Sequence, residues 1–256
     1  MKPEPASPIA ESSGTFVLIP AYNEAAAIRT VVEEVRALDP SLRILVLDDC
    51  SSDNTAAIAE AAGAEVVRLP CHLGLGGCVQ TGYRMVHEMG AQTAVRIDGD
   101  GQHNPADIPR LLGRLRATGC EMVIGVREEG TNPTSTGLIR RIGIAFFKLL
   151  LRPILGRRVT DPTSGFVAVN RRALHTFGQS FPLEYPEIET LVVLQRRAFR
   201  FEEVPVQMRP RMGGRSSLTA VRSIYFVVHV LLGVLVNILR LDAWRWLGNR
   251  EAARRG

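Results

Sequence analysis

The sequence has few cysteines, and its four form neither a C-x-x-C pair nor the spacing of a zinc site. This argues against a disulfide-stapled scaffold and against a structural zinc module. We expect the cysteines to be reduced and partly buried, as in a cytosolic chain. The first residues, 1–14, are rich in Pro, Ser, Ala and Glu and lack the apolar segment of a signal peptide. We expect a flexible tail there.

No apolar run has the length of a membrane span. The last one, Ile224–Leu239, has about 16 residues, whereas a spanning helix needs about 20. Arginines flank both of its ends and two tryptophans follow, which is the pattern of an interfacial segment. We therefore expect an amphipathic helix that lies in the membrane interface. A buried helix that closes the domain is the alternative.

The phosphate-binding loops of common nucleotide-binding folds are also missing. The glycines at 74, 76 and 77 lack the Lys-Ser/Thr of a Walker A loop. They do not stand in G-x-G-x-x-G register with the first expected strand. Both kinds of site are therefore rejected.

What is present fits one globular domain of moderate size with an appendage. The chain has 256 residues, of which 46% are hydrophobic and 22% charged. Its net charge of +5 favours anionic partners such as phosphates, nucleic acid or an anionic membrane. The charge alone does not indicate which of these partners the chain binds.

Short apolar runs alternate with helical patterns over most of the chain. This alternation predicts βαβ units, and hence an α/β fold with a mostly parallel, Rossmann-like sheet flanked by helices. The expected strands are Thr15–Ile19, Arg43–Leu47, Glu65–Leu69, Ala94–Ile97, Glu121–Gly125, Val167–Val169 and Phe201–Met208. The expected helices are 25–38, 54–62, a helix that follows the loop 72–77 and ends near 89, 105–117, 138–152 and one opened by 184–189.

Polar residues follow three of these strands directly. They are the segments Tyr22–Glu24, Asp48–Asp49 and Asp98–Asp100. In open parallel sheets, ligands bind outside the carboxyl ends of the strands. The three segments are therefore expected to form one site.

The segment Asp98-Gly99-Asp100 carries the strongest chemical signal. In extended chain, residues i and i+2 point to the same side, so both carboxylates can converge on one point. Two such carboxylates repel unless a cation lies between them, and hard divalent cations prefer oxygen ligands. We expect Mg²⁺ or Mn²⁺ there, with Gln102 adding an amide oxygen. Taken alone, such a segment is more often a solvated turn, and the other polar segments are what favour the metal site.

Two basic segments point to anions. The expected helix 138–152 mixes arginine and lysine with apolar residues, which indicates either a membrane-surface helix or a core helix with a solvated basic face. The loop Arg209–Ser217 carries three arginines and two adjacent glycines. We interpret it as a flexible loop that closes on an anionic group; a solvated surface loop is the alternative.

Four motifs together resemble glycosyltransferase family two. They are P-A-Y-N-E at 20–24, D-D-C-S-S-D-N-T at 48–55, D-G-D-G-Q-H at 98–103, and D-P-T-S-G-F at 161–166 followed by N-R-R-A-L. The resemblance is strongest to the dolichol-phosphate mannose synthase and polyprenyl-phosphate glycosyltransferase branch, and it covers roughly 15–218. It implies a GT-A fold, a nucleotide-sugar donor, a divalent metal and an inverting transfer.

The resemblance also implies residue roles. Nucleotide and donor binding falls to Pro20, Tyr22, Glu24, Asp48 and Asp98, and phosphate contacts fall to Arg127, Arg209 and Arg211. The metal ligands are Asp98, Asp100 and Gln102, and the catalytic residues are Asp100 and Asp161. Asp161 is the candidate general base for a hydroxyl acceptor. The family's lysine in its G-x-S-K motif is replaced here by Ser217, and Arg215 would supply the charge.

The resulting expectation is a glycosyltransferase domain at 15–220, preceded by the tail 1–14 and followed by a membrane-associating segment at 221–256. It would move a hexose from a GDP-mannose or UDP-glucose type donor to a polyprenyl or dolichyl phosphate. The enzyme would work at the cytoplasmic face of the membrane as a peripheral or monotopic protein. It would bind no nucleic acid and could form a homo-oligomer. Two alternatives are a soluble family-two enzyme that acts on a small hydroxyl acceptor, and a non-catalytic regulator that binds nucleotide sugars.

Overall fold

The computed structural model describes residues 14–127, 152, 155–156, 159–184 and 186–211. Several predictions lie outside these residues. They are the N-terminal tail up to 13, the helix 138–152 apart from its last residue, the basic loop after Arg211, and the apolar segment 224–239.

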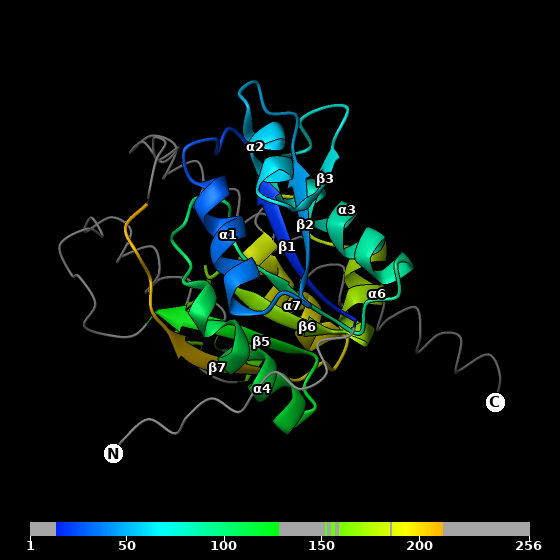
Figure 1. Ribbon diagram of the computed structural model, residues 1–256. Coiled ribbons are helices and arrows are strands. Elements are labelled where there is room, and N and C mark those ends of the chain that lie inside the picture. The colour runs from blue at the N-terminus through cyan, green and yellow to red at the C-terminus, as the bar shows by residue number, and fades with distance from the viewer. Residues whose placement is uncertain (1–13, 128–151, 153–154, 157–158, 185, 212–256) are drawn as a thin grey trace, which may run out of the picture.

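The described strands form one seven-stranded sheet in the order β3-β2-β1-β4-β6-β5-β7. The pairs β1–β2, β1–β4, β2–β3 and β5–β7 are parallel, whereas β6 runs antiparallel to both β4 and β5. The predicted α/β architecture with a mostly parallel sheet is thus confirmed (Figure 1). The strands are β1 (Thr15–Ala21), β2 (Arg43–Asp48), β3 (Glu65–Arg68), β4 (Thr93–Arg96), β5 (Met122–Arg127), β6 (Val167–Asn170) and β7 (Phe201–Val206).

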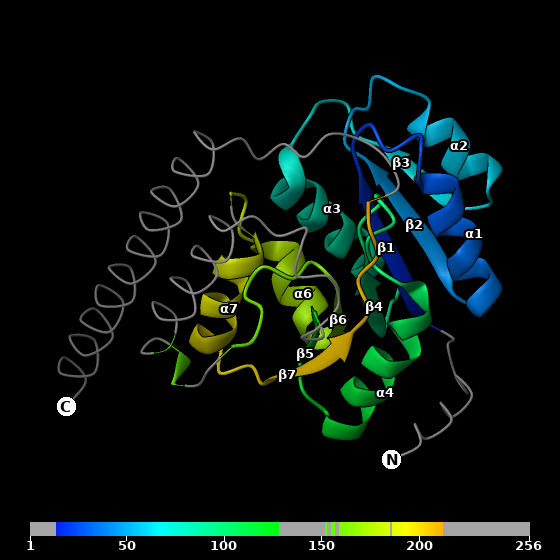
Figure 2. The same ribbon diagram turned by 90° about the vertical axis from the view of Figure 1, so that its left-hand side faces the viewer.

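Helices cover both faces of the sheet, and each face has its own apolar core. Figure 2 shows α1 and α2 on one side of the sheet and α3, α6 and α7 on the other. Side chains alternate along β1, so Val17 and Ile19 pack in one core while Phe16 and Leu18 pack in the other. The helices are α1 (Ile28–Leu38), α2 (Thr55–Ala61), α3 (Gly74–Glu88), α4 (Ile108–Thr118) with the 3-10 turn η1 (Pro105–Asp107) before it, α6 (Arg171–Gln179) and α7 (Pro186–Arg196).

Two helices differ from the predictions. Helix α3 begins at Gly74, so the glycines predicted in a loop belong to its first turn. Helix α2 begins at Thr55; the Asn54 side chain makes no capping hydrogen bond, whereas the Asp53 carboxylate accepts one from the backbone N–H of Thr55. Helix α6 was not predicted, although its N-cap Asn170 accepts a hydrogen bond from the backbone N–H of Ala173.

The described part of the chain contains all four cysteines. Its four cysteines are all free, and two of them are buried. Among the described residues, no helix is long and apolar enough to cross a bilayer.

Candidate active site

A cavity of about 620 Å³ opens at the carboxyl ends of the parallel strands, next to β1 and β4. The three polar segments that follow β1, β2 and β4 all contribute to it, as the sequence predicted. Its lining residues are Pro20, Ala21, Tyr22, Asn23, Glu24, Asp49, His72, Gly74, Leu75, Cys78, Asp98, Gly99, Asp100 and Arg211.

The turn after β4 places both of its carboxylates at this cavity. The Asp98 side chain is 36% exposed, while that of Asp100 is only 8% exposed. The backbone N–H of Gln102 donates to Asp100 Oδ1 at 2.9 Å, and the backbone N–H of Asp98 donates to Nδ1 of buried His103 at 3.0 Å. These hydrogen bonds fix the conformation of the turn, and both carboxylates line the same cavity.

Arg211 already places a positive charge between two carboxylates of the cavity. Its Nε lies 3.2 Å from Asp100 Oδ2, and its Nη2 lies 2.9 Å from Glu24 Oε1. Burial, together with repulsion from neighbouring carboxylates, raises the pKa of both Glu24 and Asp100 despite this partner. The cavity therefore concentrates negative charge and accommodates a cation.

These donors suit a divalent metal that completes its coordination with substrate oxygens. The described residues contain no group of three His, Cys, Asp or Glu side chains that could hold a metal by themselves. Asp98 and Asp100 supply two carboxylates, and Mg²⁺ is commonly held by one or two carboxylates plus substrate phosphates. The residues fit Mg²⁺ or Mn²⁺ on that condition.

An aromatic pair forms the other end of the cavity. Tyr22 is 47% exposed, and its ring lies 4.3 Å from the His72 ring between centroids, at an interplanar angle of 35°. Nδ1 of His72 lies 2.9 Å from Asp49 Oδ2, and Asp49 Oδ1 accepts a hydrogen bond from the backbone N–H of Leu73. The pair offers an exposed face on which a planar ring can stack.

His72 was missed as a site residue, and Asp49 was expected there only as part of the segment Asp48–Asp49, with no role of its own. The family resemblance assigned nucleotide binding to Asp48, the last residue of β2, but the structure buries Asp48 completely. Its carboxylate lies 3.2 Å from Arg68 Nε and accepts a hydrogen bond from the backbone N–H of Ser51. Because neighbouring residues point to opposite sides, Asp49 is the one that lines the cavity; this alternation was the available signal.

Two predicted phosphate-contacting arginines do not line the cavity. Arg209 donates to both carboxylate oxygens of Glu34, at 2.8 and 2.7 Å, and to Asn104 Oδ1 at 2.7 Å. Arg127 ends β5, and its buried Nε has no hydrogen-bond partner among the described residues.

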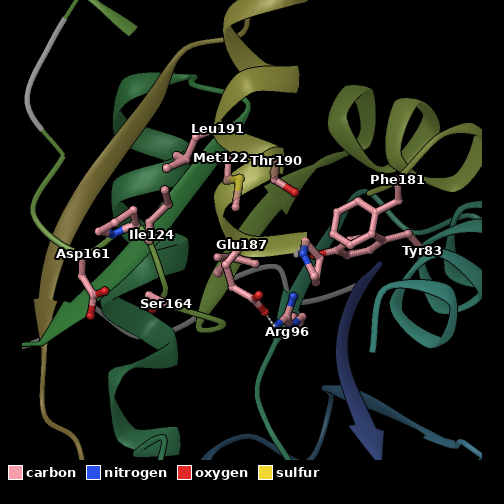
Figure 3. Close-up of a pocket in the computed structure, with 13 residues that line it drawn as sticks. Tyr83, Arg96, Met122, Ile124, Asp161, Ser164, Phe181, Glu187, Thr190 and Leu191 are labelled. Atoms are coloured by element: carbon pink, nitrogen blue, oxygen red, sulfur yellow. Dashed lines mark hydrogen bonds and ion pairs between the residues drawn. The ribbon is translucent and has the colours of Figure 1, made fainter. Parts of the chain in front are cut away.

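Gln102 and Asp161, the remaining predicted residues, do not line the cavity. Gln102 contributes backbone bonds, since its carbonyl also accepts from the N–H of Arg209 at 2.8 Å. Asp161 Oδ1 accepts from the backbone N–H and the hydroxyl of Thr163, at 3.1 and 2.8 Å. Asp161 lines a separate, small cavity of about 10 Å³ (Figure 3).

Known proteins resemble this chain in sequence. The sequence model described as "Glycosyl transferase family 2" matches residues 16–178. Undecaprenyl-phosphate mannosyltransferase of Micrococcus luteus is 29% identical over 254 residues, which cover 92% of this chain and 97% of that protein. UDP-N-acetylglucosamine–dolichyl-phosphate N-acetylglucosaminyltransferase of Methanococcus voltae is 29% identical over 215 residues, covering 75% of this chain and 84% of that protein.

Solved structures share the fold. Glucosyl-3-phosphoglycerate synthase of Mycobacterium tuberculosis in complex with phosphoglyceric acid has a TM-score of 0.61 and 27% identity, covering 79% of this chain and 72% of that one. The same enzyme with Mn²⁺, UDP-glucose and phosphoglyceric acid has a TM-score of 0.65 and 25% identity, covering 87% and 79%. The α/β fold is therefore GT-A-like.

Proposed function

This chain belongs to glycosyltransferase family 2, and we propose that it transfers a hexose from a nucleotide sugar to a polyprenyl or dolichyl phosphate with inversion at the sugar carbon. The observation that carries the proposal is one cavity that is lined both by an exposed aromatic pair and by two carboxylates, those of Asp98 and Asp100. A nucleotide sugar needs both, because it has a planar base at one end and a diphosphate at the other.

We assign the roles in the cavity accordingly. Tyr22 and His72 stack on the base, and Glu24 lies between that end and the metal. Asp98 and Asp100 hold Mg²⁺ or Mn²⁺, with Gln102 as a further candidate ligand. When bound, such a metal neutralises the leaving diphosphate as a Lewis acid. Arg211 lies 3.2 Å from Asp100, within reach of the same phosphates.

The acceptor assignment rests on relatives that match most of the chain and are named for lipid phosphates. A lipid phosphate is an anion at neutral pH, so it needs positioning and charge screening more than a general base. This is compatible with Asp161 lying outside the cavity lining. We place the catalytic domain at 15–220 and propose that 221–256 holds it at the cytoplasmic face of the membrane.

A small hydroxyl acceptor is the second candidate. It is favoured by the structural likeness to a synthase crystallised with UDP-glucose and phosphoglyceric acid. Such an acceptor would require a base to remove the hydroxyl proton, and Asp161 would have to approach the donor.

A donor and acceptor screen with the purified full-length chain separates these candidates. GDP-mannose, UDP-glucose and UDP-N-acetylglucosamine, each labelled in the sugar, are offered with undecaprenyl phosphate, dolichyl phosphate or 3-phosphoglycerate. We expect label to enter the organic phase only with a lipid phosphate. Label found solely on 3-phosphoglycerate would support the second candidate, and nucleotide-sugar binding without transfer to any acceptor would contradict both.

The metal is tested in the same assay. We expect EDTA to abolish transfer and added Mg²⁺ or Mn²⁺ to restore it. Without a cation, the carboxylates of Asp98 and Asp100 would repel the leaving diphosphate instead of neutralising it. Full transfer by the EDTA-treated, desalted enzyme would contradict the assigned metal role.

A further inference from the structure

A fully buried arginine lies directly behind the carboxylate of Asp98. Arg96 is the last residue of β4 and is only 3% exposed. One nitrogen, Nη2, faces two acids: it lies 2.5 Å from Glu187 Oε1 and 3.8 Å from Asp98 Oδ1. Figure 3 shows Glu187 pointing toward Arg96 across the small cavity, with a dashed line joining the two.

The two acids meet Arg96 from distant parts of the chain. Glu187 is in the first turn of α7, 91 residues from Arg96, and its side chain is 18% exposed. Nε of Arg96 has no hydrogen-bond partner among the described residues. Burial opposes the positive charge, but the two carboxylates outweigh it and raise the pKa of Arg96.

The loop before β6 passes close to this contact at a glycine, Gly165. A Cβ at Gly165 would lie 2.5 Å from Arg96 Nη2 and 3.2 Å from each Asp98 carboxylate oxygen. A Cβ at this position would therefore require the end of the Arg96 side chain to shift from the place where it contacts Glu187.

We infer that Arg96 is a positioning residue that fixes the Asp98 carboxylate toward the donor cavity, and that Glu187 is the counter-charge that keeps Arg96 from neutralising Asp98. With Glu187 in place, Arg96 gives its closer contact to Glu187 and only a longer one to Asp98. The Asp98 carboxylate is then oriented, and its charge is not taken up by a close ion pair with Arg96. The inference rests on the proposed function, since it concerns a carboxylate assigned there to the metal.

The alternative is that the Arg96–Glu187 ion pair only stabilises the packing of β4 against α7, and this alternative predicts a different result. Buried pairs can often be replaced by apolar residues of similar volume without loss of stability. If the pair only packs β4 against α7, its charge would not matter to the cavity. Cation binding at Asp98 separates the two readings.

The first test measures Mn²⁺ binding by the full-length chain, from the electron paramagnetic resonance signal of free Mn²⁺, with Mn²⁺ alone and again with UDP. Glu187→Gln keeps a hydrogen-bond acceptor for Arg96 but removes its counter-charge. We expect its Mn²⁺ Kd to rise about tenfold, because Arg96 then turns its charge on Asp98. Glu184→Gln, an exposed residue nearby, is the matched control and should keep the wild-type Kd.

The second test uses Arg96→Met combined with Glu187→Met, which removes both charges and retains the volume. We expect this variant to fold, to keep an Mn²⁺ Kd near the wild type, and to lose about tenfold in kcat because Asp98 is no longer oriented. It decides the question even if Glu187→Gln fails to fold.

The outcomes are distinct. A Glu187→Gln Kd within twofold of wild type, or wild-type kcat in the double variant, would overturn the inference while leaving the proposed function intact. Absence of both Mn²⁺ binding and transfer in the wild type would overturn the proposed function and the inference with it.

Discussion

At the scale of single residues, the candidate site contains a carboxylate, Asp100, whose ionised form is destabilised by burial. Asp100 is nearly buried, and burial together with repulsion from Asp98 raises its pKa. A raised pKa means that the folded chain binds a proton at Asp100 more tightly than the unfolded chain does. The ionised carboxylate is thus useful for holding a cation but costs stability at neutral pH.

We therefore expect Asp100→Asn to raise Tm while it lowers transfer about a hundredfold or more. Asparagine resembles the protonated acid and can still accept the hydrogen bond from the N–H of Gln102. Its contact with Arg211 is partly exposed and is worth little. The gain should be a few degrees, since about 1 kcal/mol shifts Tm by about 2–4 °C at this size.

The pH dependence checks the cause of this gain. Because the folded-state pKa of Asp100 is raised, the stability that this group contributes is present below its unfolded pKa and is lost as pH rises through the folded value. The advantage of Asp100→Asn should therefore be largest near pH 8 and vanish near about pH 4. Thermal melts without divalent metal measure it, and a variant less stable than wild type near pH 8 would contradict the argument.

At the scale of elements, the strands were predictable and their mutual directions were not. Apolar runs such as that of β1, ended by polar residues, identify buried strands. The sequence of Val167–Asn170 does not indicate that β6 runs antiparallel to its two neighbours, β4 and β5. Helix α6 was missed because its short apolar pattern starts beside two arginines, although Asn170 is an ordinary capping residue.

The site shows the same limit. Tyr22, Glu24, Asp98 and Asp100 line the cavity as predicted, because the carboxyl ends of parallel strands meet at one edge. His72 and Tyr22 come from two loops that are far apart in the sequence, and no sequence pattern indicates that their rings are in contact. The close approach of Arg96 to Glu187 likewise depends on tertiary packing.

The glycines at the start of α3 give an element-scale prediction. A Cβ on Gly76 would lie 2.3 Å from the carbonyl oxygen of Leu183, so α3 packs there against backbone that cannot yield as a flexible side chain would. We expect Gly76→Ala to destabilise the chain by about 1–3 kcal/mol, the usual cost of overpacking. Chemical denaturation would measure the loss.

Gly113→Ala is the matched control. Gly113 lies within α4, and a Cβ there would meet nothing within 4 Å. Alanine in an exposed helix interior stabilises by about 0.5–1 kcal/mol relative to glycine. If the two variants were equally stable, Gly76 would not be a packing constraint.

At the scale of the whole molecule, the net charge of +5 and the sequence pI near 9.4 favour an anionic surface. The apolar segment 224–239 has arginines on both sides and lies outside the described residues. A lipid-phosphate acceptor would require the catalytic cavity to reach such a surface. These features predict binding that is partly electrostatic and partly apolar.

We expect the full-length chain to co-sediment with vesicles that contain phosphatidylglycerol, and only weakly with vesicles of phosphatidylcholine alone. Raising salt from about 0.05 M to about 0.5 M should weaken the binding, because the Debye length falls well below 10 Å over that range. Arg240→Glu combined with Arg245→Glu should reduce retention several-fold, since each basic residue near an anionic surface contributes about 1 kcal/mol. Arg116→Glu combined with Arg197→Glu, at two exposed positions on or next to α4 and α7, makes the same change in net charge elsewhere on the chain. An equal loss of binding in both double variants would show that net charge alone drives binding. Equal binding to both kinds of vesicle at every salt concentration would contradict the electrostatic contribution.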